Sequence, residues 1–352
     1  MKRQVELDFI RGIAILLVLH FHFSSSDVFI YPFPELPLVN FGWAGVDLFF
    51  VLSGFLVGGL LCREWAETGS VDAMSFLKRR AFKIWPGYYV LIAAYVVTRK
   101  EPLNTFLWAN LLNVQNYVGS SISHSWSLAV EEHFYLVLSF AIWWCASRGV
   151  TTRTFLKTTM IVVVVVAIYR TFLAVNSKAF FFQTHTRMDA LLLGVVLAVL
   201  FRFYKPRFLE LQAKTILWAL LLAAAIVILF RFPQFDKSGV QIIAADLGSV
   251  ALIMLLYKPG REHNVAYNLV ARIGAYSYGI YLWHTSITAP VIAVVDRLGI
   301  SWLQYPVRFV AAVLVGVLMT KLIEAPFLRL REKIVPASRR PAVVAAYAGS
   351  SL

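Results

Sequence analysis

The stretch LDFIRGIAILLVLHFHF, residues 7–23, has the composition of a membrane-spanning helix and still carries ionisable side chains. Charged groups at membrane depth are costly and normally face a protein interior or a wet cavity. On an α-helix, Arg11 and His22 lie about three turns apart, so they share one face with roughly 16 Å between them. His20 projects from the opposite side. The spacing predicts a functional face with a cation near one end and an imidazole near the other. The alternative is that Arg11 only snorkels to the interface and His22 lies at the surface.

The rest of the chain extends this membrane character. Of its 352 residues 59% are hydrophobic and 15% charged, and the mean hydropathy is +0.71. Soluble domains have about a quarter charged residues. We therefore expect an all-α, polytopic integral membrane protein of about ten spans with both termini in the cytoplasm. The expected spans are 7–24, 41–61, 84–98, 126–146, 156–175, 187–203, 214–230, 240–257, 272–295 and 303–325.

The formal net charge of +14 follows from this topology. With the N-terminus inside, most Lys and Arg fall in cytoplasmic segments, as the positive-inside rule requires. No nucleic acid partner is needed to explain the charge. The two cysteines, Cys62 and Cys145, lie near expected cytoplasmic helix ends and imply no disulfide framework. The first span lacks a small-residue cleavage site, so we expect it to be retained.

The domain organisation is simple. We expect one transmembrane domain over residues 1–335 and a disordered cytoplasmic tail over residues 336–352. Residues 99–125 are too polar for a clean span and are typical of an interfacial or re-entrant helix. The span at 156–175, which contains MIVVVVVAIY, is expected to face lipid. The pattern contains no metal-ligand spacing.

The second span places an acid among small and apolar residues. Gly54 and Gly58 form a small-xxx-small pair, which favours close helix packing. Asp47 near the outer end is a candidate for substrate binding, although it could instead cap the helix N-terminus.

A basic cluster precedes the third span. Lys78, Arg79, Arg80 and Lys83 lie in an expected inner loop, and Pro86 follows and should break or kink the helix. The cluster could anchor the chain to anionic lipid. It could equally bind phosphate, because guanidinium groups match phosphate oxygens.

Further ionisable residues mark the expected outer ends of later spans. Glu131 and Glu132 lie near the start of the fourth span, where carboxylates suit general acid or base work. Arg187 and Asp189 open the sixth span about 200° apart round the helix, so each should pair with other residues. His284 lies within the ninth span and is either a buried neutral imidazole or part of the site.

These segments together resemble one known family. The resemblance rests on residues 7–23, on GVDLFFVLSGFL at 45–56, FLKRRAFKIWP at 76–86, WSLAVEEHFYL at 126–136, RMDALLLG at 187–194, YSYGIYLWHTSI at 276–287 and EAPF at 324–327. The chain resembles the membrane-bound acyltransferase 3 family, whose members O-acylate surface polysaccharides, lipid-linked sugars, peptidoglycan and some antibiotics.

The resemblance implies roles for particular residues. It implicates Arg11 and His22 in acyl transfer, and it assigns the handling of acyl-coenzyme A to the inner motif with Arg80 and Lys83. The family usually has a second Arg where this chain has Lys83, which keeps the charge but loses the guanidinium fork. Some relatives carry an extracellular hydrolase-like domain after the last span. This chain ends there, so we expect transfer to finish in the membrane domain or with a separate partner.

We therefore expect an O-acyltransferase of the cell membrane with no permanently bound cofactor. Its donor would be acyl-coenzyme A, with acetyl as the expected group, held by Arg79, Arg80 and Lys83. His22 would be the general base or would carry the acyl group, with Arg11 and Glu131 or Glu132 assisting. A further set would bind the acceptor, a hydroxyl of a glycan or lipid-linked sugar: Asp47, Arg187, Asp189 and His284.

Other functions fit parts of the same pattern. Acylation of a small secondary metabolite such as a macrolide is one alternative, and a polytopic transporter without acyl chemistry is another. An assembly protein does not explain the separately placed ionisable residues. Membrane lipids are expected partners, and a homo-oligomer is left open.

Overall fold

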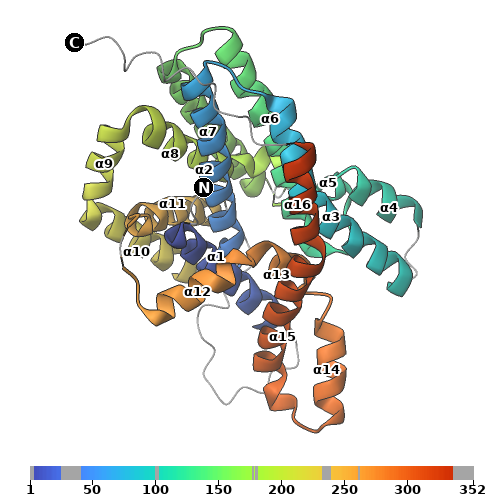
Figure 1. Ribbon diagram of the computed structural model, residues 1–352. Coiled ribbons are helices and arrows are strands. Elements are labelled where there is room, and N and C mark those ends of the chain that lie inside the picture. Colours follow the sequence, from blue (N-terminus) through green and yellow to red (C-terminus); the bar gives the residue numbers. More distant parts are fainter. Residues whose placement is uncertain are drawn as a thin grey trace, which may run out of the picture.

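The computed structural model describes residues 4–24, 41–99, 103–176, 178, 181–231, 239–260 and 262–335, and these contain helices and no strands (Figure 1). The helices that match the expected spans are α1 (Val5–Ser24), α2 (Ala44–Thr68), α3 (Ala73–Arg99), α6 (Trp126–Ser147), α7 (Thr152–Val175), α8 (Met188–Phe203), α10 (Thr215–Arg231), α11 (Gly239–Leu256) and α15 (Gln304–Met319). The shorter helices are α4 (Leu103–Leu111), α5 (Gln115–Val118), α9 (Lys205–Ala213), α12 (Val265–Ala275), α13 (Ser277–Trp283), α14 (Thr288–Arg297) and α16 (Ala325–Ile334).

The prediction of an all-α, multi-pass membrane protein is confirmed. Within the described ranges, 7 helices are long and apolar enough to cross a membrane, and the number rises to 9 if each of two bent pairs is one span. The bent pairs are α9 with α10, at 68°, and α13 with α14, at 70°. The sixth expected span is α8, which has only 16 residues and lies packed along α2.

The ninth expected span is not one helix, contrary to the prediction. Residues 265–297 form α12, α13 and α14 with a break after Trp283. Pro290 lies near the start of α14, and a proline ring clashes with the carbonyl four residues earlier, here that of Ser286, which favours a helix break before it. The break places His284 at a helix end in the protein interior.

The structure also corrects the prediction for the third span. The basic cluster lies on α3 itself, which starts at Ala73, and the helix runs through Pro86 without a break. Prolines are tolerated in membrane helices where neighbouring groups supply hydrogen bonds. Here the Tyr278 hydroxyl donates to the Ile84 carbonyl across 2.6 Å, beside the proline.

Glycines let two helix pairs meet backbone to backbone. A side chain at Gly54 would lie 1.9 Å from the Leu191 carbonyl oxygen, and one at Gly194 would lie 2.0 Å from that of Val51. Gly58 lies against Val195 on the same seam, so the predicted packing role of α2's small residues is confirmed. Helices α1 and α12 meet in the same way.

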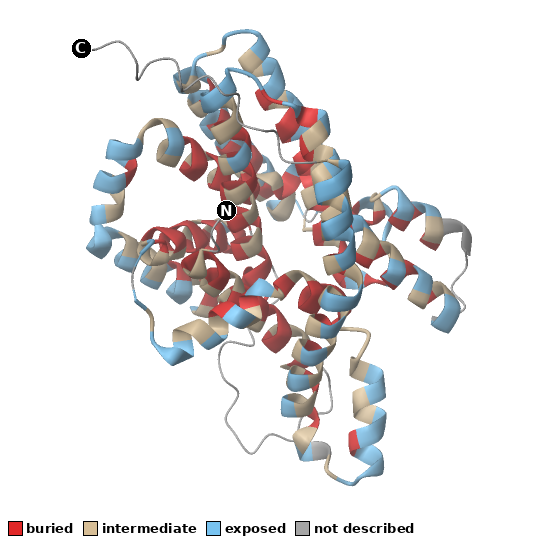
Figure 2. Cartoon of the chain, in the orientation of Figure 1, coloured by how far each residue is buried: buried red, intermediate tan, exposed pale blue. Residues whose placement is uncertain are grey.

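The bundle has a largely apolar interior that also encloses several polar side chains, and large apolar side chains are exposed on its outside. Figure 2 shows buried residues at the centre and exposed residues on peripheral helices such as α9 and α14. The exposed faces of α7 and α10 carry large aliphatic side chains, as a lipid-facing surface requires: Val164, Val165, Ile216 and Leu220. The expected tail over residues 336–352 lies outside the described residues.

The cytoplasmic orientation of the termini remains a prediction. Ser70, between α2 and α3, and Ser121, before α6, are both exposed and fall on opposite sides of the expected membrane. In a chain with Cys62→Ala and Cys145→Ala, an impermeant thiol reagent should label Ser121→Cys in intact cells and should not label Ser70→Cys. The reverse labelling pattern would invert the topology.

Candidate active site

A cavity of about 490 Å³ lies between α1, α2, α3, α6 and α13. Its lining includes three cations from the predicted site, Arg11, Arg80 and Lys83. Two more, Arg63 and Arg202, come from the expected cytoplasmic ends of α2 and α8. An anionic ligand entering from that side would therefore meet positive charge from several helices.

Arg80 is the best-placed cation of the predicted donor site. Its guanidinium carbon lies 5.4 Å from the ring centre of Phe76 and 5.5 Å from that of Tyr135. The Tyr135 hydroxyl donates to Glu131 at 2.7 Å and lies 2.6 Å from the Ser53 hydroxyl. Aromatic rings and a nearby carboxylate thus hold the guanidinium at the cavity wall.

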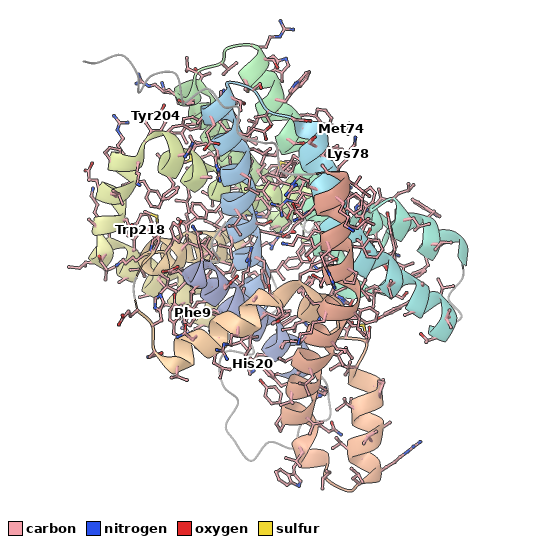
Figure 3. The ribbon with its side chains drawn as sticks, in the orientation of Figure 1. Phe9, His20, Met74, Lys78, Tyr204 and Trp218 are labelled. Atoms are coloured by element: carbon pink, nitrogen blue, oxygen red, sulfur yellow. The ribbon has the colours of Figure 1, made fainter. Side chains whose placement is uncertain are left out.

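The other basic residues of this cluster point elsewhere. Arg79 donates to the Val335 carbonyl oxygen at 2.6 Å and lies 3.5 Å from Glu332, so it fastens α3 to the end of α16. Lys78 is exposed near α16, where Figure 3 labels it. Neither lines the cavity, and the prediction that Arg79 contacts the donor is not supported by its position.

The two glutamates occupy different surroundings. Glu131 lines the cavity beside Arg80, whereas Glu132 accepts a hydrogen bond from the Trp85 indole at 3.0 Å. That one of them assists His22 stays a prediction, and the Nδ1 atom of the imidazole has a backbone partner. That atom lies 3.0 Å from the Val18 carbonyl oxygen, one turn earlier in the same helix.

The cavity lining includes a pair of hydroxyl groups. Tyr281 and Ser127 both line it, and their hydroxyl oxygens lie 2.5 Å apart. The Tyr281 hydroxyl also donates to the His124 carbonyl oxygen at 2.8 Å. These two hydrogen-bonded side chains therefore form a polar part of the cavity wall.

Three histidines lie close to one another near Tyr281. The ring centres of His22 and His284 are 4.8 Å apart, and those of His124 and His284 are also 4.8 Å apart. The Tyr281 ring lies 5.6 Å from His124 and 5.7 Å from His284. We call His22, His124 and His284 the histidine cluster. No group of three metal-ligating side chains among the described residues is arranged to hold a metal ion.

His20 belongs to another part of the bundle, as the helical spacing predicts. Its Nδ1 lies 2.6 Å from the hydroxyl of Tyr305 on α15, whereas His22 faces His284 beside α13. Figure 3 labels His20 well below Lys78 in the view. The predicted face of α1 thus joins Arg11, at the cavity, to His22, in the histidine cluster.

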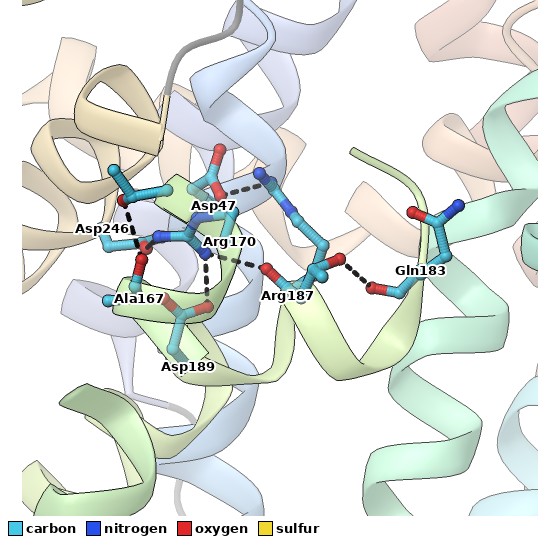
Figure 4. A network of polar contacts seen from close by, with 9 residues as sticks. Asp47, Ala167, Arg170, Gln183, Arg187, Asp189 and Asp246 are labelled. Carbon is cyan, nitrogen blue, oxygen red and sulfur yellow. Dashed lines mark hydrogen bonds and ion pairs between the residues drawn. The ribbon is translucent and has the colours of Figure 1, made fainter. Parts of the chain in front are cut away.

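The remaining acidic and basic candidates form a buried ion network (Figure 4). Arg187 pairs with Asp47 at 2.5 Å, and Arg170 pairs with Asp189 at 2.7 Å and with Asp246 at 3.3 Å. All five side chains are at most 2% exposed. The prediction that Arg187 and Asp189 pair with other residues rather than with each other is confirmed.

This network changes the interpretation of three predicted substrate-binding residues. Asp47, Arg187 and Asp189 are neutralised within the protein and do not line the cavity. Arg187 is further enclosed by aromatic rings, with its guanidinium carbon 4.8 Å from the centre of Phe181. Their contacts are those of residues that join helices, and any contact with substrate stays a prediction.

Sequence reasoning missed several members of these sites. Arg170 lies in the span expected to face lipid, yet its side chain is fully buried, because two aspartates from other helices surround it. His124 falls in a polar connection with no periodicity. Tyr281 looked like an ordinary aromatic residue of the ninth span. Arg170 could have been found, since a lone arginine within an apolar span needs a partner.

The sequence also matches a known family along most of its length. Residues 4–321 match a family model described as an acyltransferase domain. The chain belongs to this acyltransferase family. The matched range includes the histidine cluster, the ion network and every cavity-lining cation named above. Glu324, which also lines the cavity, lies just beyond it.

The sequence identity to individual relatives is low. The acyltransferase is 25% identical over 333 residues to the peptidoglycan O-acetyltransferase OatA of Listeria monocytogenes. The matched region covers 82% of this chain and 50% of that protein. The acyltransferase is also 25% identical over 216 residues to the O-acetyltransferase OatA of Staphylococcus aureus, covering 54% of this chain and 34% of that protein. The chain thus spans about half the length of these curated relatives, or less. No solved structure matches it significantly.

The buried network yields a stability prediction. Arg170→Met leaves Asp189 and Asp246 buried without their cation, which typically costs about 3–5 kcal/mol. We expect a clearly lower unfolding temperature in detergent than for Arg153→Met, an exposed position on the same helix. Equal unfolding temperatures for the two variants would show that the ion pairs do not hold α7 to α8 and α11.

Proposed function

We propose that this protein is a membrane O-acetyltransferase that moves an acetyl group from cytoplasmic acetyl-coenzyme A to a hydroxyl group of a glycan. The proposal is carried by one observation: Tyr281 lines a cation-lined cavity and its ring also lies against two members of the histidine cluster. This arrangement supplies a place for an anionic donor and, beside it, imidazoles able to carry out acyl transfer.

The donor is proposed to enter from the cytoplasmic end. Coenzyme A carries phosphates at one end and the thioester at the other, so the phosphates suit the arginines and the thioester points toward Tyr281. Arg80 contributes a guanidinium fork, whereas Lys83 contributes a single ammonium group. Arg11 carries an ion pair of 2.9 Å with Asp8 and extends the positive lining along α1.

His22 is proposed to perform the transfer. A carbonyl oxygen can only accept a hydrogen bond, so the contact with Val18 fixes the proton on Nδ1 and leaves the lone pair on Nε2. That nitrogen either removes the proton of the acceptor hydroxyl or carries the acetyl group for part of the reaction. In both cases a carbon–sulfur bond breaks, a carbon–oxygen bond forms, and the departing thiolate takes a proton.

The acceptor class is inferred from the relatives. Two of them are named as O-acetyltransferases, and one of these as acting on peptidoglycan. A glycan hydroxyl on the outer side of the membrane fits a transfer site at the far end of the cavity. His284 contacts the ring of His22, so it can also contact the acceptor, as expected from the sequence.

The first test addresses the transfer residue. With acetyl-coenzyme A and soluble peptidoglycan fragments as probes, His22→Ala should abolish ester formation, because no other nitrogen has its position on the α1 face. His20→Ala should keep most of the activity, since its partner is Tyr305 on another helix. Mass spectrometry of the fragments measures the product. Equal loss from both variants would contradict the proposed role of the α1 face.

The second test addresses the donor site. Losing a charge-assisted contact costs about 1.5–3 kcal/mol, so Arg80→Ala should weaken acetyl-coenzyme A binding roughly ten- to a hundredfold. Lys78→Ala removes the same charge two residues earlier on an exposed position and should leave the affinity unchanged. Titration in detergent without anionic lipid separates donor binding from lipid anchoring. Unchanged affinity in a folded Arg80→Ala protein would exclude Arg80 from the donor site.

A further inference from the structure

The three imidazoles of the histidine cluster are held in different hydrogen-bonding states. Each has one ring nitrogen against a backbone carbonyl oxygen, which fixes its proton there: His22 Nδ1 with Val18 at 3.0 Å, His284 Nδ1 with Tyr281 at 2.6 Å, and His124 Nε2 with Leu282 at 3.2 Å. The lone pair of each ring therefore lies on the opposite nitrogen.

The opposite nitrogens of His124 and His284 have different surroundings. His124 Nδ1 lies 3.2 Å from the Thr285 hydroxyl, which can donate to it, so this imidazole is engaged at both ends. His284 Nε2 has no hydrogen-bond partner among the described residues, although the side chain is fully buried. Buried polar atoms are seldom left without a partner, and such an exception calls for an explanation, of which a catalytic role is one.

We infer that His284, through Nε2, is the general base that takes the proton of the acceptor hydroxyl, and that His22 is the acyl carrier. This inference rests on the proposed function and divides its chemistry between two residues. The 4.8 Å between the two ring centres allows one acceptor hydroxyl to approach the acyl group on His22 and the lone pair of His284 together. His124 is a positioning residue that packs against the other side of His284.

The acyl group moves first to His22 and then to the acceptor. In the first step, His22 Nε2 attacks the thioester carbonyl, a nitrogen–carbon bond forms and the carbon–sulfur bond breaks. The thiolate leaves with the electron pair and takes a proton from water in the cavity. In the second, the acceptor oxygen attacks, the carbon–nitrogen bond breaks and its electron pair returns to His22 Nε2. The hydroxyl proton passes to His284 Nε2 and then to solvent.

A test can separate this base from a structural residue. Hydroxylamine attacks acyl groups without first losing a proton, so hydroxamate formation should not require His284. His284→Asn keeps an amide N–H near the position of Nδ1, where it can still donate to Tyr281, and removes Nε2. We expect ester formation on peptidoglycan fragments to fall about a hundredfold or more, and hydroxamate formation from acetyl-coenzyme A to continue.

The matched control is His20→Asn, the same substitution on a neighbouring helix, which should leave both products unchanged. His284→Gln fills more of the ring's volume and repeats the test if the asparagine variant does not fold. A single-turnover measurement adds a second readout. Without any acceptor, release of the coenzyme thiol should be as fast in His284→Asn as in the wild type, because the first step does not use His284.

The outcomes are distinct. Loss of the ester with retention of hydroxamate and thiol release supports the inference. Equal loss of ester and hydroxamate in a folded variant, or no loss of either, overturns it. A wild-type protein that forms neither product from acetyl-coenzyme A refutes the proposed function itself, and the inference with it.

Discussion

Two arginines buried inside an apolar bundle impose the main constraint on this fold. A guanidinium within a membrane needs carboxylate partners, and Arg170 and Arg187 find theirs on other helices. These pairs join α7 to α8 and α11, and α8 to α2. The Arg187–Asp47 pair joins the same two helices as Gly54 and Gly194, where only hydrogen atoms in place of side chains allow the backbones to meet. Electrostatics and steric fit thus select one register of α2 against α8.

The position of α2 determines where the cavity can form. Its inner face supplies Phe49 and Ser53 to the lining, and Ser53 supports the Tyr135 hydroxyl beside Arg80. Helix α1 contributes a second wall and carries Arg11 and His22 on the face that follows from their spacing. Because α12 crosses α1 at Gly12 and Gly274, α13 follows at a short distance and places Tyr281 and His284 opposite His22. The site is therefore assembled by helices that the network and the glycine contacts fix.

Much of this could be predicted from local pattern. The apolar spans, the α1 face and the small-residue seam depend on periodicity that a single helix displays. The features that the sequence did not predict depend on contacts between distant segments. Nothing near Asp47 indicates that its partner is Arg187, 140 residues later. The break at His284 depends on Pro290 and on interior packing, whereas Pro86 is accommodated by a donor from α13. His124 acquires its place only because Leu282 and Thr285 come to meet it.

The same geometry bears on the choice between transfer and transport. Tyr281 lines the cavity, packs against the histidine cluster and has its hydroxyl oxygen 2.5 Å from that of Ser127. A carrier of the same architecture would have to move a whole solute past these side chains and past fully buried His284. Acyl transfer requires only that a thioester reach the imidazole, while both larger substrates stay on their own sides. A buried imidazole beside the cavity wall suits that smaller displacement, because burial limits the water that would hydrolyse an acyl group there.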